Sequence, residues 1–120
     1  MILKTEYKNM LSYITKDGSI IRELFHPDDC GNKNQSLAEA IIPVGCETLS
    51  HRHNQSEEIY HIIEGSGLMV LGKEQFEVTA GDTVCMLPGE AHCIKNTGEA
   101  PLKLLCCCSP PYSHEDTDIV

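Results

Sequence analysis

Residues 45–58 read GCETLSHRHNQSEE, and together with PGEAH at residues 88–92 they carry most of what this chain reveals about itself. Alternate residues of a β-strand point to the same side of the strand. A strand through HRH therefore turns His51 and His53 toward one point, while Arg52 faces away. The spacing predicts a pair of imidazoles aimed at a common target.

Two further side chains extend this pair. Glu58 begins a second candidate strand, on which Tyr60 and Ile62 share its side. His92 follows Pro88-Gly89, a turn pair that delivers it from a third strand. Imidazoles with one carboxylate suit transition metals such as Fe, Mn, Ni, Co, Cu or Zn, whereas all-oxygen sets suit Ca or Mg. The sequence thus predicts a divalent transition-metal site, without naming the metal, whose ligands are His51, His53, Glu58 and His92.

The rest of the chain is expected to be all-β. From about residue 19 onward, short apolar or alternating stretches are separated by turn residues, a pattern typical of a sandwich or barrel. The first fifteen residues fit either an edge strand or a short helix, and residues 110–120 are expected to form an extended, acidic surface tail. The candidate strands are residues 19–25, 36–42, 47–53, 58–64, 67–71, 74–79, 83–87, 92–96 and 102–108.

A hairpin and the strand alternation supply candidates for the wall of a pocket. Gly72-Lys73 is expected to form a tight turn, which places Met69 on the same face as Phe76. Tyr60 either orients a substrate through its hydroxyl or simply packs in the wall. In residues 102–108, Lys103 should face water, so Cys106 and Cys108 should face the interior. A role in small apolar packing is favoured for them over a redox role. The candidate pocket residues are Tyr60, Met69, Phe76, Ile94 and Cys106.

Charge and composition exclude several classes of partner. The net charge is -9 with only 9 basic residues, so nucleic acid and anionic membrane surfaces are disfavoured. No apolar run is long enough for a signal peptide or a membrane span. The seven cysteines are odd in number and three of them are consecutive, which favours reduced thiols over a disulfide framework. A cytoplasmic protein is expected.

The order and spacing of these residues resemble the cupin superfamily, in particular its small single-domain members. The first cupin motif runs Gly, five residues, His-x-His, three or four residues, Glu, six residues, Gly, and residues 45–65 match it throughout. The second motif spans residues 81–96 and is met except that Leu87 stands in the place of a proline, beside Pro88. The matching positions are Gly45, His51, His53, Glu58 and Gly65, then Gly81, Gly89, His92 and Asn96.

The resemblance implies one cupin domain over residues 1–120, a double-stranded β-helix or jelly-roll barrel with the metal held inside. A barrel that has lost its metal is the weaker alternative, because the full set of three histidines and one glutamate is present. Small cupins resembling this chain are frequently homodimers, and Leu68 and Val70 would supply an exposed apolar patch.

For function, the resemblance implies a metal centre that holds a small polar or carboxylated molecule. Dioxygenase, decarboxylase and isomerase chemistry are the candidate activities, and oxalate-decarboxylase-like and sugar-isomerase-like cupins are the first analogies. The alternative is a non-catalytic, metal-dependent module that binds or senses a small molecule. Whether the chain is an enzyme stays open at this point.

Overall fold

The computed structural model describes all 120 residues, and strands dominate it. Two short helical turns interrupt them, a 3₁₀ turn at Tyr7–Asn9 and α1 at Pro27–Cys30. No helix has the length and apolar character that crossing a membrane requires. The strands are β1 (Ser12–Ile14), β2 (Ile20–Phe25), β3 (Ser36–Ile42), β4 (His51–His53), β5 (Glu57–Glu64), β6 (Ser66–Leu71), β7 (Glu74–Thr79), β8 (Thr83–Met86), β9 (His92–Asn96), β10 (Leu102–Ser109) and β11 (Thr117–Ile119).

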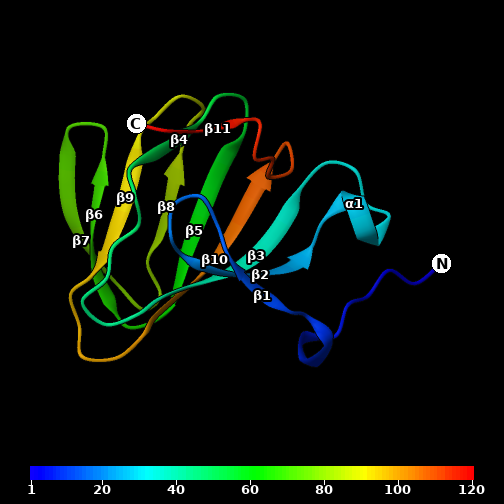
Figure 1. Ribbon diagram of the computed structural model, residues 1–120, viewed down its shortest axis with the longest axis horizontal. Helices are drawn as coiled ribbons and strands as arrows, with labels where there is room; N and C mark the ends of the chain where they lie inside the picture. Colours follow the sequence, from blue (N-terminus) through cyan, green and yellow to red (C-terminus); the bar gives the residue numbers. More distant parts are fainter.

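The strands form two antiparallel sheets that face each other as a jelly-roll barrel (Figure 1). One sheet has the order β1-β2-β3-β10-β5-β8, and the other has the order β11-β4-β9-β6-β7. Strands far apart in the sequence therefore lie side by side, as β10 does between β3 and β5. The expected all-β, double-stranded β-helix fold is confirmed.

Alternation of burial along the strands places the core between the two sheets. In β10 every second residue from Leu102 to Cys108 is buried, while Lys103 and its alternates are partly exposed, as expected. The core contains a single aromatic side chain, Tyr60, and otherwise consists of aliphatic, methionine and cysteine side chains. These inward-facing residues line the space in which the histidines converge.

The turn between β5 and β6 explains one glycine of the first motif. Gly65 has a φ of 88°, in the left-handed region that favours glycine. A Cβ atom at this position would also lie 2.9 Å from the backbone oxygen of Pro101. Any larger residue would push β5 and β6 away from the start of β10.

The structure differs from the sequence-based expectations in three places. Only residues 51–53 of the expected strand 47–53 form β4, because Leu49 donates its backbone N–H to the carbonyl of Asp17 instead of to a neighbouring strand. The first fifteen residues contain both a 3₁₀ turn and the edge strand β1. Within the tail, residues 117–119 form β11 against β4, and Thr117 is buried there.

The expected exposed patch on β6 is also different. Leu68 and Val70 are only partly exposed, because β6 lies between β7 and β9. Leu68 pairs with Glu77 of β7 on one side and with Lys95 of β9 on the other. Among the strands, the exposed large aliphatic residues are Ile59 and Ile63 of β5 and Ile14 of β1 in the other sheet, and Ile119 of β11 in the same sheet as β6.

Candidate metal centre

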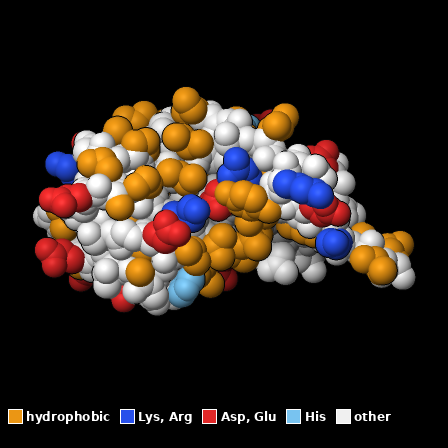
Figure 2. Space-filling model, turned by 90° about the horizontal axis from the view of Figure 1, so that it is seen from below, with side chains coloured by type: hydrophobic (Ala, Val, Ile, Leu, Met, Phe, Trp, Pro, Cys, Tyr) orange, Lys and Arg blue, Asp and Glu red, His pale blue; other side chains and the backbone are white.

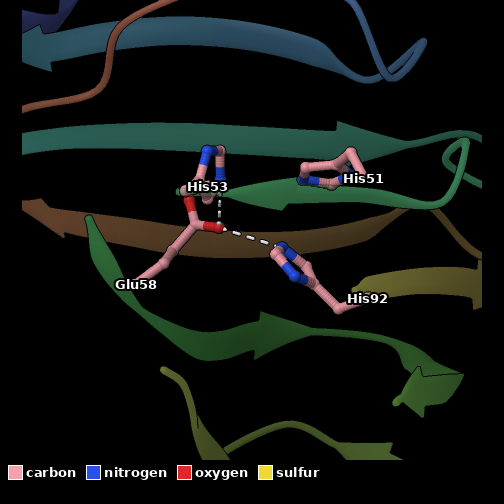
Figure 3. Close-up of side chains that lie close together, drawn as sticks. All are labelled: His51, His53, Glu58 and His92. Atoms are coloured by element: carbon pink, nitrogen blue, oxygen red, sulfur yellow. Dashed lines mark hydrogen bonds and ion pairs between the residues drawn. The ribbon is translucent and has the colours of Figure 1, made fainter. Parts of the chain in front are cut away.

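Three strands bring the four predicted ligands together inside the barrel (Figure 3). β4 contributes His51 and His53, whose side chains are buried while Arg52 between them is exposed. β5 contributes Glu58, and β9 contributes His92, which pairs directly with His51 across the two strands. All four residues are buried, and one ligand atom from each lies within 4.8 Å of the others.

The outer ring nitrogens of the histidines are all bound to protein oxygens. His51 Nδ1 lies 2.9 Å from the carbonyl oxygen of Leu49, and His92 Nδ1 lies 3.1 Å from that of Glu90. Carbonyl oxygens only accept, so both Nδ1 atoms carry the proton. When the ring is neutral, its Nε2 atom therefore presents a lone pair to the centre, the arrangement that metal-binding histidines use.

The third histidine is held by the C-terminal strand. His53 Nδ1 lies 2.9 Å from the hydroxyl oxygen of Thr117, and that hydroxyl donates its own proton to the carbonyl of Ser113, 2.8 Å away. The hydroxyl can therefore only accept from His53. This fixes the same tautomer in the third ring, and Nε2 again faces inward.

Glu58 completes the set. Its Oε1 lies 3.1 Å from His53 Nε2 and 3.2 Å from His92 Nε2, the two dashed contacts of Figure 3. Its other oxygen, Oε2, accepts from the thiol of Cys108 at 3.2 Å. In their neutral state the Nε2 atoms present lone pairs, as the Glu58 carboxylate does, so a buried cation is needed to hold these atoms together, and in the metal-free protein that cation is the proton that bridges Nε2 and Oε1. The donor set therefore fits a divalent transition metal.

The electrostatics of the cluster agree with this reading. Burial raises the pKa of Glu58, but the hydrogen bonds and positive charge offered by His53 and His92 outweigh burial and lower that pKa overall. Burial lowers the pKa of His53, but the hydrogen bond and charge of Glu58 outweigh it and raise that pKa overall. Burial and the neighbouring His92 lower the pKa of His51. The carboxylate is held ionised, ready to bind a cation.

A fifth polar side chain at the centre was not expected from the sequence. Asp17, in the turn between β1 and β2, has only 9 % of its surface exposed, and its Oδ2 lies 3.6 Å from His51 Nε2. Its Oδ1 accepts three hydrogen bonds, from the hydroxyl of Thr15 and from the backbone and hydroxyl of Ser19. Asp-Gly is an ordinary turn signal, so nothing in the local sequence marks Asp17 as part of the site.

A cavity with about 40 Å³ of free space adjoins the cluster, and only some of the expected pocket residues line it. Tyr60 and Cys106 line the cavity, together with Cys108. Met69, Phe76 and Ile94 do not; Met69 and Ile94 are fully buried in the core and Phe76 packs against it. The β6–β7 hairpin has the expected register but lies away from the cavity.

The opposite wall of the cavity comes from segments that sequence reasoning left out of the site. The β1–β2 hairpin contributes Tyr13 and Asp17, β2 contributes Glu23, and the C-terminal segment contributes Tyr112 and Thr117. The remaining histidines lie outside the cluster: His26 caps α1, His61 bonds Thr83, and His114 is exposed beside Tyr112.

Comparison with known proteins gives related sequences. An uncharacterised protein of Methanocaldococcus jannaschii is 60% identical over 119 residues, which cover 99% of this chain and 95% of that protein. The oxalate-binding protein of Thermotoga maritima is 34% identical over 74 residues, which cover 62% of this chain and 61% of that protein.

Solved structures show the same fold at low sequence identity. A Thermotoga maritima protein described as a predicted oxalate decarboxylase has a TM-score of 0.76 and 23% identity, over 92% of this chain and 99% of that chain. The Streptomyces nucleoside dehydratase Pac13 has a TM-score of 0.80 and 14% identity, over 100% of this chain and 92% of that chain.

A family match agrees with the motifs and with the site. Residues 38–108 match the family model described as "Cupin domain", and this segment contains all four clustered ligands. Because the match covers more than half of the sequence, the chain belongs to the cupin family.

Proposed function

We propose that this cupin holds one divalent transition metal through His51, His53, Glu58 and His92 and presents it to a small polar or carboxylated molecule in the adjoining cavity. The observation that carries the proposal is the engagement of all three Nδ1 atoms by protein oxygens, which turns three Nε2 lone pairs toward Glu58. When bound, such a metal supplies Lewis-acid chemistry toward an oxygen atom of the ligand.

The chain's own residues prepare the site in two ways. The thiol of Cys108 holds Glu58 Oε2, which leaves Oε1 turned toward the histidines. Tyr60, also buried, lines the cavity beside His92, with their ring centroids 5.8 Å apart. The oxalate-binding relative from Thermotoga maritima supports a small oxygen-rich ligand as the general class.

Dioxygenase, decarboxylase and isomerase activity remain the candidate reactions, and metal-dependent binding without turnover is the second candidate function. The test uses untagged protein reconstituted with Fe²⁺, Mn²⁺, Ni²⁺ or Co²⁺ and incubated with small carboxylates, diketones and sugars. Oxygen uptake or product formation that disappears in His92→Ala establishes an enzyme. Saturable ligand binding with no turnover across the panel establishes a binding module. Absence of both binding and turnover with metal-loaded protein contradicts the proposal.

We also propose that the chain forms a homodimer through the outer face of β5 and the N-terminal segment. Ile59 and Ile63 on that face are 41% and 40% exposed and flank the partly buried His61, and Glu57 is the one carboxylate of β5 on the same side. Two copies with a net charge of -9 repel each other least where they meet through a mainly apolar face. Figure 2 shows hydrophobic side chains at the end of the N-terminal segment, which projects from the barrel.

Light scattering on wild type and on an Ile59→Ser, Ile63→Ser double variant tests the dimer. A wild-type mass of two chains and a variant mass of one chain support the interface. A wild-type mass of one chain at micromolar concentration contradicts it.

A further inference from the structure

The cavity beside the metal cluster is lined unequally by acidic and basic groups. Three carboxylates line it, from Asp17, Glu23 and Glu58, against one ammonium group, from Lys16. That ammonium is committed elsewhere, because Lys16 Nζ donates to the carbonyl oxygens of His114 and Thr117 at 2.8 and 2.9 Å. No lysine or arginine side chain in this cavity is therefore free to pair with a carboxylate ligand, and the metal would be its cationic partner.

The charge of a divalent ion would also be balanced before any ligand arrived. Glu58 supplies one negative charge, and Asp17, whose Oδ2 lies 3.6 Å from His51 Nε2, supplies a second beside the centre. Three hydrogen bonds accepted by its Oδ1 hold the Asp17 side chain in this position. A dianion placed in the cavity would gain little from the metal and would be repelled by Asp17 and Glu23.

Two carboxylate oxygens at the cavity lack a donor. Asp17 is nine-tenths buried, and its Oδ2 has the 3.6 Å contact with His51 as its polar contact. Glu23 accepts from the hydroxyl of Tyr13 through Oε2 at 3.2 Å, but its Oε1 is buried and has no hydrogen-bond partner. Of the two, Glu23 Oε1 is the buried atom without a partner, which is costly, and a ligand that brings O–H groups would supply a donor to either carboxylate.

We propose that the cavity selects an uncharged, hydroxyl-bearing molecule over a dicarboxylate, and that Asp17 and Glu23 determine this specificity by accepting hydrogen bonds from its hydroxyl groups. The inference rests on the proposed metal centre and narrows its ligand class. The free space of about 40 Å³ holds roughly three water molecules, so the ligand, or the part of it that enters, is small.

The experiment compares two probes of equal heavy-atom number on Co²⁺-loaded protein: dihydroxyacetone, which is neutral with two hydroxyls, and oxalate, which is a dianion. Binding is followed by the visible spectrum of Co²⁺. Wild type, Asp17→Asn, Glu23→Gln and the exposed control Glu99→Gln are titrated in parallel. Because a hydrogen bond to a charged group is worth more than one between neutral groups, each site variant should bind dihydroxyacetone about tenfold more weakly.

Two results together support the proposal. Wild type and Glu99→Gln should bind dihydroxyacetone more tightly than oxalate, and Asp17→Asn and Glu23→Gln should bind the two probes equally or bind oxalate more tightly. Tighter binding of oxalate by wild type overturns the proposal, and so does an unchanged ratio in both variants. Complete loss of Co²⁺ binding in Asp17→Asn also overturns it, because Asp17 would then be a metal ligand, whereas a modest fall in Co²⁺ affinity is expected from removing the nearby charge. Failure of wild type to bind Co²⁺ at all is a failure of the proposed function and is seen at the loading step.

Discussion

His53 Nδ1 lies 2.9 Å from the hydroxyl oxygen of Thr117, which joins the metal cluster to the C-terminal strand across 64 residues of sequence. Thr117 is buried, and its hydroxyl donates to the carbonyl of Ser113. β11 therefore sets the orientation of His53, a proposed metal ligand on β4, in addition to extending the sheet.

Replacing Thr117 with Val should weaken metal binding while the barrel stays folded. The valine has nearly the same shape but cannot accept the Nδ1 proton, so the orientation and tautomer of His53 are no longer fixed. Loss of such a partner weakens metal affinity about 10- to 100-fold in comparable sites. Competition with a chromophoric chelator measures the change, with the exposed Thr97→Val as the matched control. Equal affinity in the two variants would show that Thr117 does not act through His53.

Metal affinity should fall as the pH is lowered from about 8 to about 6, the range in which imidazoles take up protons. The pKa of His53 is raised in the metal-free protein because Glu58 outweighs burial, so its proton competes with the metal from a higher pH than in an ordinary histidine. Metal affinity falls with falling pH because protonated His53 cannot bind a cation. Calorimetric titration at several pH values checks this, and an affinity independent of pH would contradict it.

Met69→Ala should destabilise the fold without changing the metal centre. Met69 is fully buried between the sheets and does not line the cavity. Removing a buried side chain of this size costs about 2–5 kcal/mol in unfolding free energy. Urea denaturation measures the loss, and metal affinity within about twofold of wild type confirms the separation of core from site. A large change in affinity with little loss of stability would place Met69 in the pocket after all.

Cys108→Ser should leave the metal bound but change its spectrum. The thiol holds Glu58 Oε2 at 3.2 Å, and the serine hydroxyl is a shorter, stronger donor to the same carboxylate. The electronic spectrum of the Co²⁺-loaded variant should therefore shift, with affinity changed by about tenfold at most. The partly exposed Cys107→Ser, which faces the other way on β10, is the control and should leave the spectrum unaltered.

Much of this architecture follows from local sequence patterns. Alternation in HRH predicted that His51 and His53 share one face of their strand. The same alternation placed Tyr60 on the side of Glu58 and Ile94 on the side of His92. These predictions succeed because the side-chain period of a strand is a local property. The match to the cupin motifs then predicted the barrel in which the four candidate ligands meet.

The missing parts of the site depend on contacts between distant segments. Asp17 has the sequence context of a turn residue, and long-range hydrogen bonds bring this turn to the cluster, from Leu49 to the Asp17 carbonyl and from Lys16 to the carbonyls of His114 and Thr117. Thr117 lies in what reads as a polar tail, yet it pairs with His53 across β11 and β4. Met69 and Ile94 were expected in the pocket because they face inward, but an inward side chain can lie in the packed part of a barrel as well as in its cavity.

Metal content of untagged protein tests the central claim most directly. After reconstitution with Co²⁺ and removal of free ion, wild type and His61→Ala should each retain about one metal ion per chain, whereas His51→Ala and His92→Ala should retain little. His61 is the matched control because it lies on the opposite side of β5 and bonds Thr83. Metal content that is the same in all four proteins, or absent from the wild type, would contradict the account.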